Sequence, residues 1–123
     1  SPITSHEDHA NPNVVKVVLG ERGRCLYFSR SPIPHLRGLS LPEAPVFRHA
    51  GVYAFRKPFL ERFTSWPPGS LERAEALEQL RALENGVEVR AAVAPWRAAG
   101  VDSPEDVPAV EAVLAAENSD PRC

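Results

Sequence analysis

The chain has 123 residues, a formal net charge of −2 and a sequence pI near 6.1, so it has room for one modest domain with its own core. The nearly balanced charge argues against a nucleic-acid partner, and the sequence has neither an apolar run that could span a bilayer nor a secretory signal. Two cysteines make neither a metal cluster nor a disulfide framework, which favours a reducing, cytoplasmic setting.

The first thirteen residues are polar and rich in turn-forming types. His6, Glu7, Asp8 and His9 could form a metal cluster, but the same run is typical of a solvated turn or a capping segment.

Two apolar runs follow, at residues 14–19 and 24–30, around the turn chemistry of residues 20–23. This spacing predicts a β-hairpin. Lys16 lies inside the first run and Arg30 ends the second. Because an unpaired buried cation is unfavourable, we expect each to meet an anionic partner, either a protein carboxylate or a ligand.

A loop is expected from His35 to Pro45, and the residues from 46 to 56 then read as a central strand rich in β-branched and aromatic side chains. In a strand, His49, Tyr53 and Phe55 share one face, and Gly51 between the first two leaves space for a ligand or another backbone. The alternative is a core strand whose His and Tyr are satisfied inside the protein.

The second half of the chain alternates helix and strand signals. Pro58 predicts a short helix over residues 57–65, and Ser70 is expected to cap a longer helix that ends at Asn85-Gly86. Residues 87–93 alternate as a strand, Ser103-Pro104 begins a helix that runs to about Glu117, and residues 118–123 should fray. About four strands and three helices indicate an α/β or α+β layered fold.

Several segments in order resemble one enzyme family: residues 11–18, 26–34, 48–56, 71–72 with 77–86, and 100–106. Together, over about residues 11–115, they are similar to the C-terminal half of the 3-deoxy-manno-octulosonate cytidylyltransferases, or CMP-KDO synthetases. The resemblance implies an α/β fold, namely the C-terminal half of a Rossmann-like nucleotidyltransferase (nucleotide-diphospho-sugar transferase) with a mixed sheet and flanking helices.

The resemblance also implies an activity. Enzymes of this family transfer CMP from CTP to the acid sugar KDO with Mg²⁺, giving CMP-KDO and pyrophosphate for lipopolysaccharide biosynthesis, as cytoplasmic homodimers. Residues 1–123 would then be the sugar-binding and dimerisation half of a cytidylyltransferase domain, with CTP and KDO as its partners and no nucleic acid or membrane.

The family's functional residues fall on named positions of this sequence. The resemblance assigns Arg30, His49, Tyr53, Glu78 and Gln79 to the sugar site and Asp102 to the magnesium ion as the catalytic residue. A sugar acid needs a cation for its carboxylate and neutral donors for its hydroxyls, which fits this set.

Other interpretations of these residues stay open. Arg30 could pair with Glu78, Asp102 could cap the last helix, and Glu78 with Gln79 could be a solvated helix face.

The family's N-terminal half, with its CTP-binding loop and second magnesium aspartate, has no counterpart in these residues, so this chain alone is expected to be inactive. It could therefore be a catalytically inactive, truncated relative that acts as a folding or dimerisation module. It could also belong to a cytidylyltransferase for another acid sugar.

Overall fold

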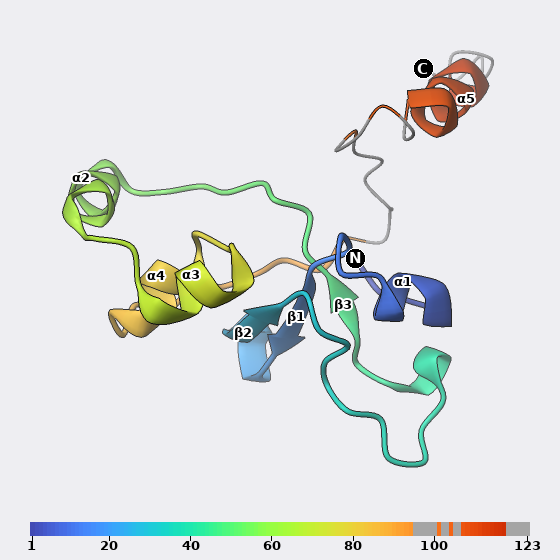
Figure 1. The fold of residues 1–123 in the computed structure, drawn as a ribbon, viewed down its shortest axis with the longest axis horizontal. Helices are drawn as coiled ribbons and strands as arrows, with labels where there is room; N and C mark the ends of the chain where they lie inside the picture. The colour runs from blue at the N-terminus through green and yellow to red at the C-terminus, as the bar shows by residue number, and fades with distance from the viewer. Residues whose placement is uncertain (95–100, 102–103, 105–106, 118–123) are drawn as a thin grey trace.

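The computed structural model describes residues 1–94, 101, 104 and 107–117 (Figure 1). Short helices surround a small sheet, and the elements run in the order α1 (His6–Ala10), β1 (Lys16–Leu19), η1 (Glu21–Gly23), β2 (Cys25–Ser29), η2 (Leu41–Glu43), β3 (Phe47–Arg48), α2 (Lys57–Ser65), α3 (Ser70–Glu75), α4 (Leu80–Glu84) and α5 (Val107–Glu117).

The sheet has three strands in the order β2-β1-β3, and both pairings are antiparallel. The predicted hairpin is confirmed: β1 pairs with β2 from Lys16↔Ser29 to Leu19↔Cys25, with an irregularity between Val18 and Leu19. The turn between the two strands places Gly23 at φ +72, a conformation that glycine adopts without steric penalty.

The predicted strand over residues 46–56 is too long, because only Phe47–Arg48 are β-strand. One further bond joins the His49 N–H to the Val15 carbonyl at 2.9 Å. In this antiparallel pairing, residues after His49 would need partners before Val15, but there the chain turns away through the bond from Val14 N to the Asn11 carbonyl. Residues 50–56 are therefore outside the regular sheet.

The strand predicted over residues 87–93 is reduced to an isolated bridge between Arg24 and Arg90. Two bonds of 2.8 Å flank it, from Cys25 N to the Val89 carbonyl and from Ala91 N to the Gly23 carbonyl. The segment lies beside the start of β2, as a fourth strand would, but without an extended ladder.

The helix predicted from Ser70 to Asn85-Gly86 is wrong in its middle, where the structure has two helices, α3 and α4. Ala76 adopts the left-handed conformation at φ 51 and ψ 49, and the Leu77 N–H bonds back to the Glu72 carbonyl at 3.2 Å. That pattern ends a helix. The cap also differs, because Gly69 takes the N-cap position and its N–H donates to the Glu72 carboxylate at 3.1 Å.

The remaining helix predictions agree in part: the last helix is described from Val107, whereas its predicted cap at Ser103 and the predicted frayed tail at residues 118–123 lie outside the described residues. The bounds of α2 are those expected from Pro58, and α5 ends at Glu117 as predicted. The segment at residues 6–9 forms α1, where Ser5 Oγ accepts from Asp8 N at 3.3 Å, so its capping interpretation holds. Among the described residues, no group of three His, Cys, Asp or Glu side chains could hold a metal ion.

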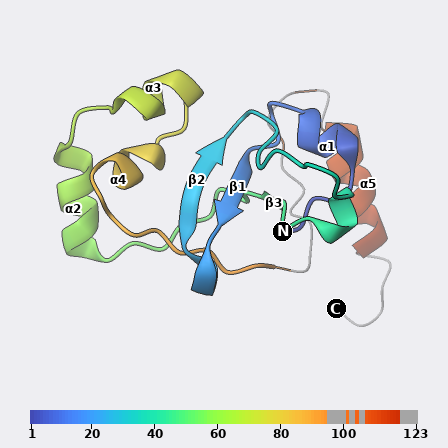
Figure 2. The same ribbon diagram turned by 90° about the horizontal axis from the view of Figure 1, so that it is seen from below.

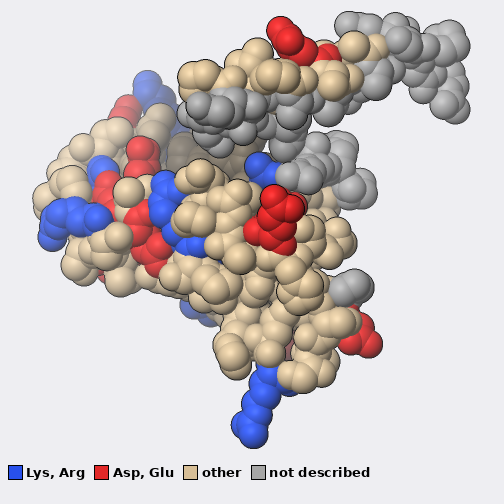
Figure 3. Space-filling view, turned by 45° about the vertical axis from the view of Figure 1, so that its right-hand side comes forward, with Lys and Arg blue, Asp and Glu red and all other residues tan. Residues whose placement is uncertain are grey.

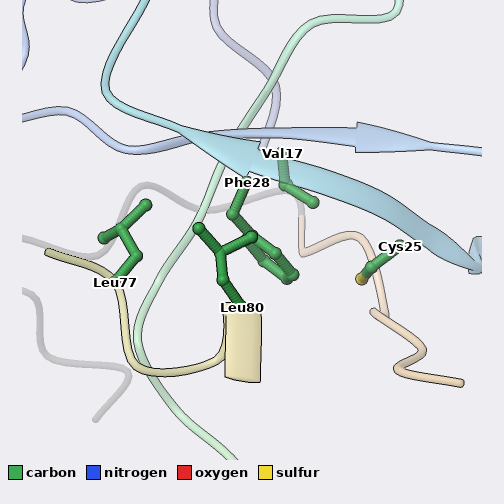
Figure 4. Packing of buried hydrophobic residues seen from close by; sticks show 5 residues of the cluster. All are labelled: Val17, Cys25, Phe28, Leu77 and Leu80. Carbon is green, nitrogen blue, oxygen red and sulfur yellow. The ribbon is translucent and has the colours of Figure 1, made fainter. Parts of the chain in front are cut away.

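The main hydrophobic cluster joins the hairpin to the turn before α4. It contains Val17, Cys25, Phe28, Leu77 and Leu80, and Figure 4 shows Leu80 directly against the ring of Phe28. Cys25 is buried as predicted, whereas Cys123 lies outside the described residues. A second cluster, of Ile3, Val14, Leu41 and Val46, packs the predicted 35–45 loop and its short η2 helix against the N-terminal segment.

In both ribbon views α2, α3 and α4 lie on the β2 side of the sheet and α1 on the β3 side (Figures 1 and 2). Acidic and basic side chains are interleaved on the face drawn in Figure 3, which agrees with the balanced net charge. A search of the described residues finds no helix with the length and apolar character needed to cross a membrane.

Candidate functional site

A cavity of about 430 Å³ lies between the extended segment after β3 and the turn that joins α3 to α4. His49, Gly51, Tyr53 and Phe55 line it from the first element and residues 76–79 from the second, with Phe63, Ala82 and Val89 completing the wall. Four of the six predicted site residues, His49, Tyr53, Glu78 and Gln79, are thus brought to one place from distant parts of the sequence.

His49 and Tyr53 form a fixed pair in this wall. Both the Gly51 N–H, at 3.2 Å, and the Tyr53 hydroxyl, at 2.7 Å, contact His49 Nε2. Because a backbone N–H can only donate, Nε2 must be the acceptor, so the tyrosine hydroxyl also donates and the imidazole proton lies on Nδ1.

The surroundings keep both groups of the pair neutral. Burial lowers the pKa of His49, and it raises the pKa of the Tyr53 hydroxyl, an effect strengthened by the nearby Cys25 and Glu78. A neutral imidazole and a protonated tyrosine hydroxyl can each form hydrogen bonds with a polar ligand.

The turn between α3 and α4 supplies the other polar groups. The Nε2 atom of Gln79 is buried and has no hydrogen-bond partner, although a buried amide donor ordinarily has one. Glu78, its neighbour, is exposed and also lines the cavity. An amide donor without a partner next to a carboxylate acceptor fits a ligand rich in hydroxyl and carboxylate oxygens.

A row of aromatic rings, which the sequence analysis did not include in the site, supports this wall. Phe55 stacks on Tyr53 with a centroid distance of 5.6 Å and an interplanar angle of 8°, and it also contacts Phe59 and Phe63 on α2. The predicted alternation that pairs His49 with Tyr53 also places Phe55 on their side, so a signal for this residue was present. The contribution of Phe63 depends on tertiary packing.

Arg30 does not line the cavity. Its guanidinium donates to three backbone carbonyls, from Nε to Glu75 at 2.8 Å, from Nη1 to Pro12 at 3.1 Å and from Nη2 to Ala76 at 3.4 Å. Ala76 itself lines the cavity, so Arg30 is one residue removed from its wall. Its carboxylate contact is with Glu75, whose Oε2 accepts from Arg30 N at 2.9 Å, rather than with the suggested Glu78.

Lys16 is fully buried, as its place in an apolar run predicted, but its direct partners are carbonyls. Its ammonium donates to the Asn11 carbonyl at 2.8 Å and to the Arg30 carbonyl at 2.5 Å. Burial lowers the pKa of Lys16, while the negative charge of Glu75 opposes that shift. Of the two expected kinds of anionic partner, a protein carboxylate is present nearby as Glu75, while the direct hydrogen-bond partners of Lys16 are carbonyls.

Asp102, the predicted catalytic and metal-binding residue, lies outside the described residues. A second cavity of about 340 Å³ shares His49, Gly51 and Tyr53 with the first and is lined by Cys25, Phe28 and residues 89–94. Much of its lining is apolar, but Ser1, Arg48 and Arg90 also line it, whereas Glu78 and Gln79 line only the first cavity.

Comparison with known proteins places this geometry in context. Residues 1–89 match the protein family described as cytidylyltransferase. The chain is 52% identical over 112 residues to the 3-deoxy-manno-octulosonate cytidylyltransferase of Koribacter versatilis, covering 91% of this chain and 42% of that protein. It is 53% identical over 115 residues to the enzyme of the same name from Syntrophobacter fumaroxidans, covering 93% and 46%.

A solved structure, described as CMP:2-keto-3-deoxy-manno-octonic acid synthetase complexed with CTP, superposes with a TM-score of 0.81 at 39% identity. The match covers 92% of this chain and 46% of that one. The chain therefore spans less than half the length of the curated relatives that it matches.

Proposed function

The chain belongs to the cytidylyltransferase family, and from this premise we propose that it supplies the sugar site of a CMP-KDO synthetase. The complete reaction transfers CMP from CTP to 3-deoxy-manno-octulosonate and releases pyrophosphate. In this proposal the sugar acid occupies the cavity at His49 and Gln79, and CTP is bound mainly by the part of the enzyme that this chain does not span.

One observation carries the proposal: Gln79 lines the same cavity as the His49–Tyr53 pair, and within the described part of the chain its buried Nε2 atom has no hydrogen-bond partner. Its volume of about 430 Å³ is within the range of small-molecule sites. An acid sugar presents a carboxylate and several hydroxyls, and each can pair with one of these groups.

The proposed roles follow from the protonation states in the site. His49 donates through Nδ1 to a sugar oxygen, and the Tyr53 oxygen accepts from a sugar hydroxyl. Glu78 accepts from further hydroxyls, and Gln79 donates to an oxygen of the sugar. Fixed hydrogen bonds of this kind hold the reacting hydroxyl in the orientation needed to attack the α-phosphate of CTP.

Arg30 remains the proposed partner of the sugar carboxylate. A guanidinium carries five N–H groups, and three are used by carbonyls, so 5 − 3 = 2 are left, one on each terminal nitrogen. Since Arg30 contacts the Ala76 carbonyl, a carboxylate would need to reach it past the edge of the 76–79 turn.

We propose Mg²⁺ as the metal ion and Asp102 as one of its ligands, on the family resemblance alone. A single carboxylate does not make a magnesium site, which needs further oxygens from substrate phosphates, water or other residues. Within the described part of the chain, no group of three His, Cys, Asp or Glu side chains could complete such a site.

The proposed setting is a cytoplasmic homodimer that works in lipopolysaccharide biosynthesis. Exposed apolar side chains next to the site support a further protein surface there, since Val52 is 89% exposed, Phe55 45% and Leu60 42%. Either a second copy or the remaining length of the enzyme could cover them, and measuring the mass of the assembled enzyme in solution distinguishes the two.

A hybrid enzyme tests the function. In it this chain replaces the matching segment of the Koribacter versatilis relative, which supplies the length that the chain does not span. We expect the hybrid to form CMP-KDO from CTP and KDO, and the 123-residue chain alone to bind KDO without turnover. A hybrid that folds but accepts only another acid sugar, or none, would overturn the proposal.

Gln79→Leu in the hybrid tests the site itself. The substitution removes the amide donor with little change in side-chain size, so the KM for KDO should rise about tenfold while the KM for CTP is unchanged. Glu61→Gln, at an exposed position of α2, is the control and should change neither.

A further inference from the structure

Glu75, the last residue of α3, joins that helix to the end of β2. Its Oε1 accepts from the Ser29 hydroxyl at 2.6 Å and from the Tyr27 hydroxyl at 3.5 Å, and its Oε2 accepts from Arg30 N at 2.9 Å. Both oxygens are thus used by donors of one strand, more than forty residues earlier in the sequence.

The contact between Glu75 and Arg30 runs in both directions. While the Glu75 carboxylate holds the backbone of Arg30, the Arg30 side chain donates to the backbone carbonyls of Glu75 and Ala76. The orientation of the guanidinium and the path of the chain after Glu75 are therefore set by one group of hydrogen bonds.

That path determines where Glu78 and Gln79 lie. The apolar pattern of residues 71–83 favours one continuous helix, but the chain leaves helical geometry at Ala76, which is left-handed despite being alanine. The left-handed conformation is unfavourable for alanine, so the contacts around Ala76 must stabilise it. Glu75 and Arg30 supply those contacts on the side of the sheet.

A negative charge at Glu75 is consistent with this role. Burial alone would raise the pKa of its carboxyl group, but the hydrogen bonds from Ser29, the Arg30 N–H and Tyr27, with the charge of Arg30, lower it overall. The same charge also lies near the buried ammonium of Lys16, which holds the Arg30 carbonyl.

We propose that Glu75 is a positioning residue for the sugar-acid site, which orients the Arg30 guanidinium and fixes the turn that carries Glu78 and Gln79. The inference rests on the proposed function, because it assigns Glu75 a part in sugar use. Glu75 itself does not line the cavity and is not expected to contact the substrate.

The chain offers a matched control in the same pair of helices. Glu72 forms an ion pair with Arg81, with side chains only 12% and 15% exposed, and so joins α3 to α4 without contacting β2. Glu72→Gln should weaken the helix pair but leave the link from Glu75 to Arg30 in place. Comparing Glu75→Gln with Glu72→Gln therefore separates an effect on the position of the site residues from an effect on the stability of the helix pair.

The experiment measures KM for KDO and for CTP in the hybrid enzyme, starting with the unmodified hybrid. For Glu75→Gln we expect the KM for KDO to rise about tenfold and the KM for CTP to stay within about twofold, as for a lost charged hydrogen-bond partner. Glu72→Gln should lower the melting temperature while leaving the ratio of the two KM values unchanged.

Two further measurements cover the case in which Glu75→Gln disrupts folding. Ser29→Ala removes the 2.6 Å bond to Glu75, together with the 3.0 Å bond from Ser31 N to Ser29 Oγ, and should raise the KM for KDO about threefold. In the ¹⁵N-labelled 123-residue chain, the Nε–Hε resonance of Arg30 should move in Ser29→Ala and stay in place in Glu72→Gln.

The outcomes are distinct. If the unmodified hybrid forms CMP-KDO but Glu75→Gln leaves the KM for KDO unchanged, or raises both KM values equally, the positioning role is wrong and the proposed function stands. If the unmodified hybrid forms no CMP-KDO, the proposed function fails and the positioning role in a sugar site is overturned with it.

Discussion

Replacing Gly23 by alanine tests how residues 89–91 are held against the hairpin. A Cβ atom at Gly23 would lie 2.5 Å from the Ala91 carbonyl oxygen, whereas ordinary contact begins at 3.4 Å, so the two groups must separate by 3.4 − 2.5 = 0.9 Å. A shift of that size breaks the 2.8 Å bond from Ala91 N to the Gly23 carbonyl and strains the neighbouring bond from Cys25 N to Val89.

The expected loss of unfolding free energy in Gly23→Ala is the sum of two separate effects. Alanine in the left-handed region costs about 1 kcal/mol, and each backbone hydrogen bond lost contributes about 1 kcal/mol more. We therefore expect Gly23→Ala to lower the free energy of unfolding by about 2 kcal/mol, about one from the backbone conformation and about one from the lost bond, measured by urea denaturation followed by circular dichroism.

Gly86 is the matched control, because its φ of +71 is nearly the same and no atom lies within 4 Å of a Cβ placed there. Gly86→Ala should cost only the backbone part, about 1 kcal/mol. Amide exchange at Ala91 should quicken in Gly23→Ala alone. Equal destabilisation by the two substitutions would show that the segment at residues 89–91 is not held against the turn as described.

Three further predictions concern the site, the core and pH. Tyr53→Phe removes the hydroxyl that bonds His49 Nε2, and in the hybrid enzyme the KM for KDO should rise about fivefold with the KM for CTP unchanged; an unchanged KM for KDO would remove Tyr53 from the site. Leu80→Ala, at a fully buried position, should lower the free energy of unfolding by about 3 kcal/mol in urea, and a loss below about 1 kcal/mol would contradict the packing in Figure 4. Since the pKa of Glu75 is lower in the folded state than its ordinary value of 4.5, its contribution to stability is complete above pH 4.5 and is lost as the pH falls through the folded-state pKa. Acid titration of unfolding should therefore be less steep in Glu75→Gln, and an identical profile would refute this assignment.

Local signals were sufficient where a residue acts on its own neighbours. Pro58 fixed the start of α2, and the alternation of residues 46–56 correctly placed His49, Tyr53 and Phe55 on one side. The hairpin followed from its turn chemistry. Each of these features depends on residues within about ten positions, which is the range that sequence patterns describe.

The errors arose where distant contacts override local preference. The break at Ala76 depends on Glu75 reaching β2, and the short β3 depends on where the chain turns before Val15. The anchoring of Arg30 on carbonyls likewise has no signal in its own neighbourhood. The site residues themselves were found through family resemblance, and the structure places four of the six around one cavity, while Asp102 lies outside the described residues.

The left-handed Ala76 has a consequence for the alternative conformations that residues 70–84 can adopt. The apolar pattern of residues 71–83 favours an uninterrupted helix, and in our proposal the contacts between Glu75 and Arg30 impose the break at Ala76. A helix-inducing solvent such as trifluoroethanol, or any substitution that frees Glu75, would allow the two short helices to fuse. In a continuous helix, the direction of each side chain is set by the regular rotation from one residue to the next. The Gln79 side chain would then point in a different direction from the one it has after the break. We therefore expect that loss of the Glu75 contacts increases the helix content of the protein.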